Sequence, residues 1–435
     1  MTPVDRFERD LPNLLAELIV PTAAGDLTDA LDRIAGVRQR PAWTLLERWL
    51  PMDAPFSGRV APAMRPAWPI IALLVLAAMA GAILLVGSRQ QRLPAPYGPS
   101  ANGAILYSAN GDIYIADANG GNSRVLIGGE GVDHAPVLAN DGTRFVFFRE
   151  VSTDHFALLG AKVDGTEIQQ LARSDVAQPS WVDWSPDGSE LLVAHVAEGR
   201  RVASIVSTDG SQAMRRLAVG DLEPEVPMWR PPDGREIVFQ GRTADRVSLY
   251  VTGVDGSAVR AVTPVKDGLG LYLGPRLSPD GRRVTYWHNQ IVNTADYPEG
   301  QKSEIHVLDL ETGDDIRIGY DTEFWQELLP KFSPDGAAVL FVRKKFIPFA
   351  SGASLTIAAA DGSDGPGRKI DSGPLHDFGT DTGGMENPVF EFSPDGRKII
   401  VAMGPQRRLL VIDVATGAVE QGDYGEFPFW QRIAP

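Results

Sequence analysis

The pentapeptide FSPDG occurs twice in this 435-residue chain, at 332–336 and again at 392–396. Four variants come earlier in the chain: LANDG (138–142), WSPDG (184–188), RPPDG (230–234) and LSPDG (277–281). The aspartates of the six copies are 46, 46, 47, 55 and 60 residues apart. A repeat of about 40–50 residues is typical of the blades of a β-propeller, so this motif decides the fold class.

Each copy has the composition of a tight turn between two strands. Proline fixes φ for the second turn position, aspartate hydrogen-bonds the local backbone, and glycine takes a positive φ. An apolar strand follows each turn, as in RFVFF (144–148) and KIIVAM (398–403). A third strand and a second turn come next, as in IHVLDLETG (305–313). Four short strands per repeat predict a propeller blade.

One further unit opens the repeat region without a preceding turn motif. Residues 104–121 (AILYSANGDIYIADANGG) supply two of its strands, and residues 427–434 (FPFWQRIA) follow the last complete repeat. A C-terminal strand inserted into this first unit would close the ring and remove both free sheet edges. We therefore predict a mainly β fold with a seven-bladed propeller over residues 102–435, and six or eight blades as the alternatives.

These repeats resemble the TolB-like family of WD-repeat-like propellers, in which an SPDG turn precedes an apolar strand and a DG turn follows the next strand. The resemblance covers nearly all of residues 102–435. It implies the fold but no single function, because propellers serve as enzymes, receptors and scaffolds alike. The GH and WD dipeptides of true WD repeats are not at the expected places.

Composition excludes several classes of function. The net charge is −15; residues 1–100 sum to +1, so residues 101–435 carry −16, which argues against nucleic acid as a partner of this part. Cysteine is absent, so disulfides, thiolate metal sites and cysteine nucleophiles are excluded. The chain has no G-x-S-x-G, H-E-x-x-H or P-loop motif. We predict no enzyme activity, no catalytic residues, no cofactor and no metal; the alternative is an enzyme site at the centre of the ring.

A membrane-spanning helix is predicted over residues 66–88. Its core, PIIALLVLAAMAGAILLVG (69–87), has no charged side chain and would form about 28 Å of helix, enough to cross a bilayer. Residues 89–101 form a linker to the propeller. More arginines lie in the segment before the helix than after it, which predicts a single-pass cell-membrane protein with a cytoplasmic N-terminus and an extracytoplasmic propeller.

Residues 1–65 are predicted to be α-helical and cytoplasmic. Asp10 and Asp26 are candidate N-caps of two short helices, and AWTLLERWLPM (42–52) has the apolar spacing of a third. The sequence VRQRPAWTLLERWLP (37–51) resembles the N-terminal part of bacterial membrane proteins that pair an anti-sigma-like segment with an outer sensor domain. That resemblance implies a sigma-factor-type cytoplasmic regulator as partner; without cysteine, the zinc-containing subtype is excluded.

Four long connections are expected on the face of the propeller opposite the SPDG turns: 289–303, 319–327, 344–354 and 371–388. Connections of this length are uncommon unless they are functional or disordered. Their aromatic and charged side chains suit partner binding, with neutral insertion as the alternative. The candidate binding residues are Tyr297, Tyr320, Trp325, Lys344, Phe346, Phe349, His376 and Asp377. The acidic residues and His376 could hold a cation, but EF-hand spacing is absent.

The architecture predicts a membrane-anchored sensor or binding protein. One face of the propeller would bind a protein partner or a small ligand, and residues 1–65 would relay this to a cytoplasmic regulator. The alternative is a structural envelope scaffold that docks other proteins without signalling.

Overall fold

The computed structural model describes residues 95, 97–172, 175–244, 246–263, 270–294, 297–319, 325–345, 353–370, 389–403 and 408–434. Every regular element in these ranges is a β-strand, as the repeats predict. The predicted helices of residues 1–65, the predicted span 66–88 and most of the linker 89–101 lie outside the described residues. Within the part that is described, no helix has the length and apolarity to cross a membrane.

The strands form antiparallel groups of four. The first group has the order β28-β1-β2-β3 and combines both ends of the described chain: β28 (Glu426–Ile433), β1 (Ala101–Ala109), β2 (Asp112–Ala116) and β3 (Arg124–Ile127). The last group has the order β24-β25-β26-β27: β24 (Val389–Phe392), β25 (Lys398–Met403), β26 (Arg408–Asp413) and β27 (Val419–Tyr424).

Two larger sheets lie between these groups. The eight-stranded sheet contains β4 (Asp133–Leu138), β5 (Arg144–Ser152), β6 (His155–Lys162), β7 (Gln169–Gln170), β8 (Val176–Trp184), β9 (Glu190–Ala197), β10 (Arg200–Ser207) and β11 (Arg215–Arg216). The pair β6–β8 joins its two groups of four through only two residue pairs.

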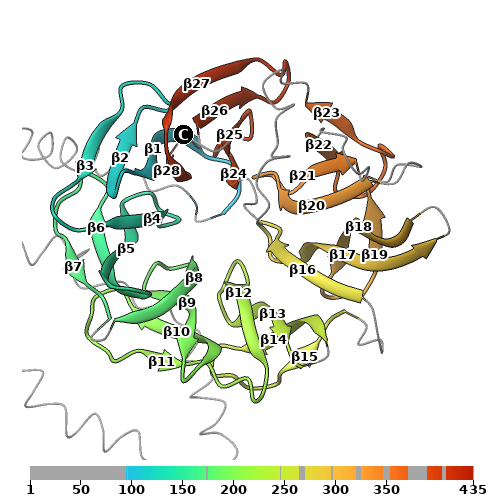
Figure 1. Ribbon diagram of the computed structural model, residues 1–435, viewed down its shortest axis with the longest axis horizontal. Coiled ribbons are helices and arrows are strands. Elements are labelled where there is room, and N and C mark those ends of the chain that lie inside the picture. Colours follow the sequence, from blue (N-terminus) through green and yellow to red (C-terminus); the bar gives the residue numbers. More distant parts are fainter. Residues whose placement is uncertain are drawn as a thin grey trace, which may run out of the picture. The chain divides into compact units, whose positions relative to one another are not determined.

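The twelve-stranded sheet contains three groups, linked by the single parallel pairs Val247–Leu271 and Ser303–Gln326. Its strands are β12 (Glu223–Trp229), β13 (Glu236–Arg242), β14 (Val247–Gly253), β15 (Arg260–Ala261), β16 (Gly270–Leu277), β17 (Arg283–Thr294), β18 (Tyr297–Asp309), β19 (Asp315–Ile318), β20 (Trp325–Phe332), β21 (Ala338–Lys345), β22 (Ala353–Ala359) and β23 (Arg368–Ile370). Figure 1 shows the groups arranged around a ring, with β4, β8, β12, β16, β20 and β24 nearest its centre.

Apolar side chains pack between each group and the next. One core cluster joins Phe239 of β13 to Leu192 of β9, and another joins Phe341 of β21 to Ile305 of β18. The series returns to its start, because a cluster containing Ile105 of β1 also contains Val411 of β26. The strands are apolar on both faces, as in RFVFF and KIIVAM, because both faces of an internal sheet are covered.

The ring is closed by the C-terminal strand, which confirms the sequence prediction. β28 pairs antiparallel with β1, with Trp430 opposite Ile105 and Phe429 opposite Leu106. Trp430 is 6% exposed, and its indole Nε1 donates to Ala118 O at 3.3 Å. The backbone hydrogen-bonding groups at this edge of the first sheet are therefore paired instead of left open.

The SPDG turns have the hydrogen bonds that their residue types predict. In the turn at 277–281, Ser278 Oγ donates to Asp280 Oδ1 at 2.5 Å, and Gly281 N donates to Ser278 O at 2.8 Å. The turn at 332–336 repeats this with Ser333, Asp335 and Gly336. These turns connect the innermost strand of a group to the next strand, so they share one face of the ring, called the turn face below.

One predicted connection is wrong. Residues 289–303 were expected to form a loop, but most of them extend the strands β17 and β18, with Asn289 opposite Ser303 and Val292 opposite Gly300. The physical reason lies in the stretch Gln290–Thr294, whose Ile291, Val292 and Thr294 are β-branched residues that favour extended backbone.

Candidate binding site at the axis of the ring

The innermost strands carry a bulge close to the turn face. Pairing shifts between Leu273 and Arg276 in β16, and between Leu328 and Lys331 in β20. The bulges contain residues with positive φ, 56° at Gly274 and 58° at Leu329. A bulge bends its strand and redirects the following side chain. The first residue after each shift is the second residue before the turn.

This position, called the axial position here, is occupied by charged residues in four of six repeats. In the motif at 277–281 the hydrogen-bonded turn begins at the second residue, Ser278, so the axial residue is Arg276. Counting back in the same way gives Val137 (β4), Asp183 (β8), Arg276 (β16), Lys331 (β20) and Glu391 (β24). The turn of the third repeat is one residue longer: Arg230 N donates to Glu236 O as Ser278 N donates to Arg283 O, so its axial residue is Met228 (β12). Asp183, Arg276, Lys331 and Glu391 interact electrostatically and are called the axial charge cluster.

Lys331 and Glu391 form an ion pair between neighbouring groups of strands. The ammonium Nζ of Lys331 donates to Glu391 Oε1 and lies 5.7 Å from the ring centroid of Phe390. The two side chains are 18% and 28% exposed, so water reaches both. Burial lowers the pKa of Lys331, while Glu391 opposes that shift. The pair therefore holds one positive and one negative charge close to the axis.

The carboxylate of Asp183 accepts a hydrogen bond from the unpaired edge of a neighbouring strand, β12. Its Oδ2 accepts a hydrogen bond from Trp229 N at 2.7 Å, on the innermost strand of the next group. Innermost strands have no neighbour on the axial side, so their amides need such partners. Burial raises the pKa of Asp183 to about 7; the amides of Trp229 and Trp184 and the charge of Arg276 oppose this only in part.

A pH-dependent stability follows for Asp183. Because its folded pKa lies above the unfolded value, the carboxyl destabilises the fold progressively as pH rises from about 4 to about 7. Each pKa unit corresponds to ~1.4 kcal/mol, and screening by water reduces the total to about 2 kcal/mol. In urea unfolding, we expect the free energy of unfolding of Asp183→Asn, relative to that of the parent chain, to be about 2 kcal/mol higher at pH 8 than at pH 4.

The control for this prediction is Asp364→Asn, which changes an exposed turn residue. It should show no such dependence on pH. A parent chain and an Asp183→Asn variant whose stability difference is the same at pH 4 and pH 8 would contradict a raised pKa at Asp183.

Arg276 is the one cation of the cluster without an ion pair among the described residues. Its guanidinium lies over the indole of Trp181, 4.4 Å from the ring centroid. Its single hydrogen bond within the described ranges runs from Nη1 to Pro275 O at 2.7 Å. Burial lowers the pKa of Arg276 to about 10, opposed by the charges of Glu391 and Asp183, so it stays protonated at neutral pH. The side chain is partly exposed.

A segment ahead of β1 also reaches this side of the ring. Arg432 Nη2 donates to Ala95 O at 3.0 Å and to Gly98 O at 2.6 Å, which fixes the backbone on both sides of Tyr97. The Tyr97 hydroxyl bonds to Asn140, a residue of the first turn motif. Burial, followed by the charge of Asp183, raises the pKa of Tyr97. Tyr97 therefore contributes to the turn face beside Asp183.

A second charged cluster is internally paired. His306 Nδ1 lies 3.2 Å from Asp315 Oδ1, and Glu304 pairs with Lys302 at 2.6 Å and Arg317 at 3.0 Å. Burial alone would lower the pKa of His306, but its bonds to Asp315 and Glu304 raise it to about 9. Each charge has an opposite partner, as in a structural network. No group of three His, Asp or Glu residues in the described ranges is arranged to hold a metal ion.

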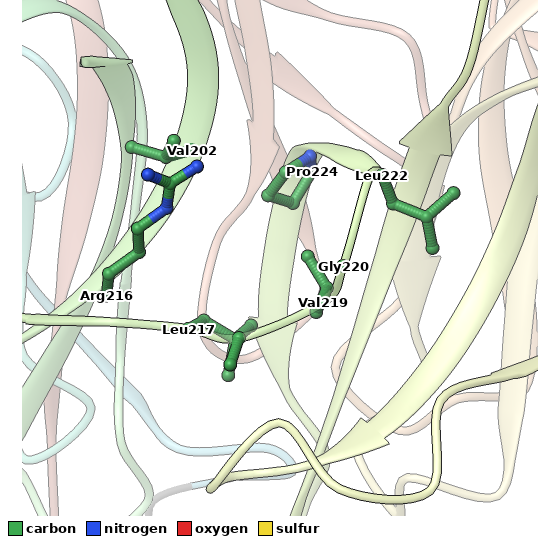
Figure 2. A pocket seen from close by; sticks show the side chains of 8 residues that line it. Val202, Arg216, Leu217, Val219, Gly220, Leu222 and Pro224 are labelled. Carbon is green, nitrogen blue, oxygen red and sulfur yellow. The ribbon is translucent and has the colours of Figure 1, made fainter. Parts of the chain in front are cut away.

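One pocket lies away from the axial position. It measures about 280 Å³ and lies beside β10, β11 and the connection from β11 to β12 (Figure 2). Its lining is mainly apolar, with Arg216 as the one charged side chain: Val202, Arg216, Leu217, Ala218, Val219, Gly220, Leu222 and Pro224. With a single charged group and no paired acid or base, it is a weaker candidate than the axial charge cluster.

Only some of the residues predicted as binding residues can be placed. Lys344 is exposed near the end of β21. Tyr297 begins β18 and Trp325 begins β20, but only their backbone is described. Tyr320, Phe346, Phe349, His376 and Asp377 lie outside the described residues. Whether these residues bind a partner therefore stays a prediction.

The sequence prediction missed the axial charge cluster, although the sequence carries its signal. Each charged residue stands two positions before the first residue of its turn, within DWSPDG, RLSPDG, KFSPDG and EFSPDG. A half-buried strand usually carries apolar or small residues at such a position. Charged residues that recur two positions before the turn therefore indicate a shared polar environment. Aligning the repeats by their turns would have revealed this set.

Comparison with solved structures places the fold among known propellers. Hydrazine synthase from Kuenenia stuttgartiensis matches with a TM-score of 0.52 and 16% identity, covering 74% of this chain and 97% of that one. An oligogalacturonate lyase from Vibrio parahaemolyticus matches with 0.51 and 13%, covering 78% and 92%. TolB from Acinetobacter baumannii gives 0.45 and 15%, covering 77% and 81%.

No family model and no curated protein matches the sequence. At these identities the structural likeness shows the fold alone. Together with the ring of four-stranded groups and the repeated SPDG turns, this likeness shows a β-propeller fold.

Proposed function

We propose that this chain is a binding protein that recognises a protein partner at the turn face of its propeller, through the axial charge cluster and the adjacent Tyr97 and Trp181. The observation that carries the proposal is the cluster itself. Four strand groups each place a charged side chain at one register position. Arginine and tryptophan are also the side chains most often found at the energetic centre of protein interfaces.

The chemistry of the cluster favours binding over catalysis. Lys331 is held by Glu391, Asp183 is held by a backbone amide, and Arg276 is stacked on Trp181. This arrangement contains no Ser, Thr or His next to a base, which nucleophilic catalysis would need.

A propeller of seven blades agrees with the seven antiparallel groups of four strands in the described residues and with the core cluster that joins the last group to the first.

We propose further that residues 66–88 anchor the propeller in the cell membrane, with the N-terminus in the cytoplasm. The support is the uninterrupted apolar run 69–87 and the arginine distribution around it. Alkaline phosphatase fused at the C-terminus should be active, and a reporter that works only in the cytoplasm should be inactive there. The reverse pattern would refute an extracytoplasmic propeller.

Signalling through residues 1–65 to a sigma-factor-type regulator is the further part of the proposal, and a scaffold without signalling is its alternative. If a signal is relayed, residues 1–65 should capture a specific cytoplasmic protein, and replacing them with an unrelated leader should abolish the cellular response. Unchanged behaviour after the replacement would favour the scaffold.

The binding proposal itself is tested by quantitative co-purification of the full chain from its native membrane. Arg276→Met combined with Lys331→Met removes both positive charges of the axial charge cluster. The matched control is Arg235→Met, because the Arg235 side chain is 86% exposed and is not a member of the axial charge cluster. We expect at least one protein to be recovered with the parent chain and the control and lost with the double variant. Equal recovery with all three would refute binding at the axis.

A further inference from the structure

Arg276 differs from Lys331, the other cation of the axial charge cluster, in having no carboxylate partner for its hydrogen-bond donors within the described residues. A guanidinium has five N–H groups, and Arg276 gives one to Pro275 O. Within the described residues no carboxylate lies at ion-pair distance from it, although Glu391 and Asp183 are close enough to act on its charge. Stacking on Trp181 holds the planar group in one orientation. Arg276 is therefore a fixed and partly exposed donor.

A fixed guanidinium suits a carboxylate or a phosphate, since both accept two parallel N–H bonds. The charges around Arg276 favour the carboxylate over the phosphate. Asp183 and Glu391 lie near Arg276, and Lys331 is already paired with Glu391. A phosphate dianion would meet two carboxylates and one uncommitted positive charge, whereas a carboxylate carries a single charge that Arg276 can balance.

The acceptor oxygen of Glu391 indicates that the ligand also carries a hydrogen-bond donor beside its carboxylate. Glu391 uses Oε1 for Lys331, which leaves Oε2 as an acceptor near the guanidinium. A ligand that presents an N–H donor next to its carboxylate would satisfy both groups. The C-terminal end of a polypeptide has this combination, because the nitrogen of its last amide N–H is bonded directly to the α-carbon that bears the carboxylate.

We propose that Arg276, supported on Trp181, is a receptor for a carboxylate, and that the ligand is the C-terminal end of a polypeptide. This inference rests on the proposed binding function and names the chemistry of its partner. A small carboxylic acid offers the same charged group, so the two sources must be separated by experiment.

The test uses the full chain in detergent with 5-fluorotryptophan in place of tryptophan, followed by fluorine NMR. Trp181→Phe identifies the signal of residue 181 by its disappearance. N-acetylglycine is the minimal probe, because it carries a carboxylate and an adjacent amide N–H. N-acetylglycinamide lacks the negative charge, and acetate lacks the N–H. Each probe is titrated to about 50 mM, which detects millimolar dissociation constants.

We expect N-acetylglycine to shift the Trp181 signal saturably and N-acetylglycinamide to bind at least tenfold more weakly. Arg276→Met should remove the response to N-acetylglycine. The matched control is Arg408→Met, which removes another stacked arginine, 4.7 Å from the ring of Tyr424 and partly exposed at the start of β26. It should leave the response unchanged. Unaltered signals from the other tryptophans report that each variant is folded.

Four results would overturn the inference or part of it. The absence of a saturable shift with N-acetylglycine, or an equal shift in Arg276→Met, refutes the carboxylate receptor. Equal binding of acetate and N-acetylglycine keeps the receptor but refutes the polypeptide end and assigns small carboxylic acids. If partner recovery is lost in the axial double variant while N-acetylglycine does not bind, the binding function stands and this ligand class is wrong.

Discussion

Trp430→Ala is expected to destabilise the propeller by about 3–5 kcal/mol, the usual cost of removing a fully packed aromatic side chain. Trp430 is 6% exposed and lies in the core cluster that joins β28 and β1 to β25 and β26. Its loss leaves a cavity where the two ends of the described chain meet, and leaves Ala118 O without its indole donor. A change of this size is a large fraction of the stability of an ordinary domain.

Urea unfolding of the full chain measures the effect, and Tyr424→Ala is the matched control. Tyr424 is also an aromatic residue near the C-terminus, but it is 46% exposed on the outermost strand of its group. Its removal should cost less than about 1 kcal/mol. If the two variants were equally stable, closure of the ring through β28 would not contribute to folding in the way the pairing with β1 indicates.

Gly281→Ala is the second substitution with a large expected effect. Gly281 closes the turn at 277–281 with φ +69°, and an added Cβ would lie 1.9 Å from Pro231 O in the preceding turn motif. That backbone atom is also fixed by its own strand group, so neither side can move away cheaply. We expect a loss of about 3 kcal/mol or more, from backbone strain and from overpacking together.

Gly336→Ala separates these two causes. Gly336 occupies the same place in the next turn, with φ +70°, but its added Cβ would come no closer than 3.4 Å to another heavy atom, Pro279 Cδ. The free energy of unfolding of Gly336→Ala should fall by only ~1 kcal/mol, the cost of a positive φ in an L-residue. Urea unfolding of both variants gives the comparison. Equal losses would mean that the packing of adjacent turns on the turn face is looser than the contact between Gly281 and Pro231 indicates.

Sequence patterns predict this fold well because each turn and strand is specified by residues that are close together in the sequence. Asp and Gly at fixed offsets specify each turn, and the apolar strand after it specifies the next element, so the groups of four and closure by residues 427–434 could be predicted. The extension of β17 and β18 through residues 289–303 was missed, because the length of these segments was taken to indicate a loop while the β-branched Ile291 and Val292 favour strand.

The candidate site was harder to predict because it depends on position relative to the axis. Lys331 and Glu391 are 60 residues apart, and nothing in either repeat alone shows that they pair. Their meeting follows only when the first strand of each repeat is known to be innermost and β20 is known to be bulged before Lys331. The long connections rich in aromatic residues were predicted to hold the binding residues, whereas the ring brings together the charged residues that precede four of the six turns.

Site-specific photo-cross-linking tests binding at the axis most directly. A benzoylphenylalanine at Val137, an axial position adjacent to the cluster, is compared with one at Val259, which is 38% exposed on the outer part of the ring. We predict that illumination of native membranes gives a discrete cross-linked protein from position 137 and none from position 259, and that Arg276→Met with Lys331→Met removes it. Cross-linking from position 259 alone, or a product from position 137 that survives the double variant, would contradict recognition through the axial charge cluster.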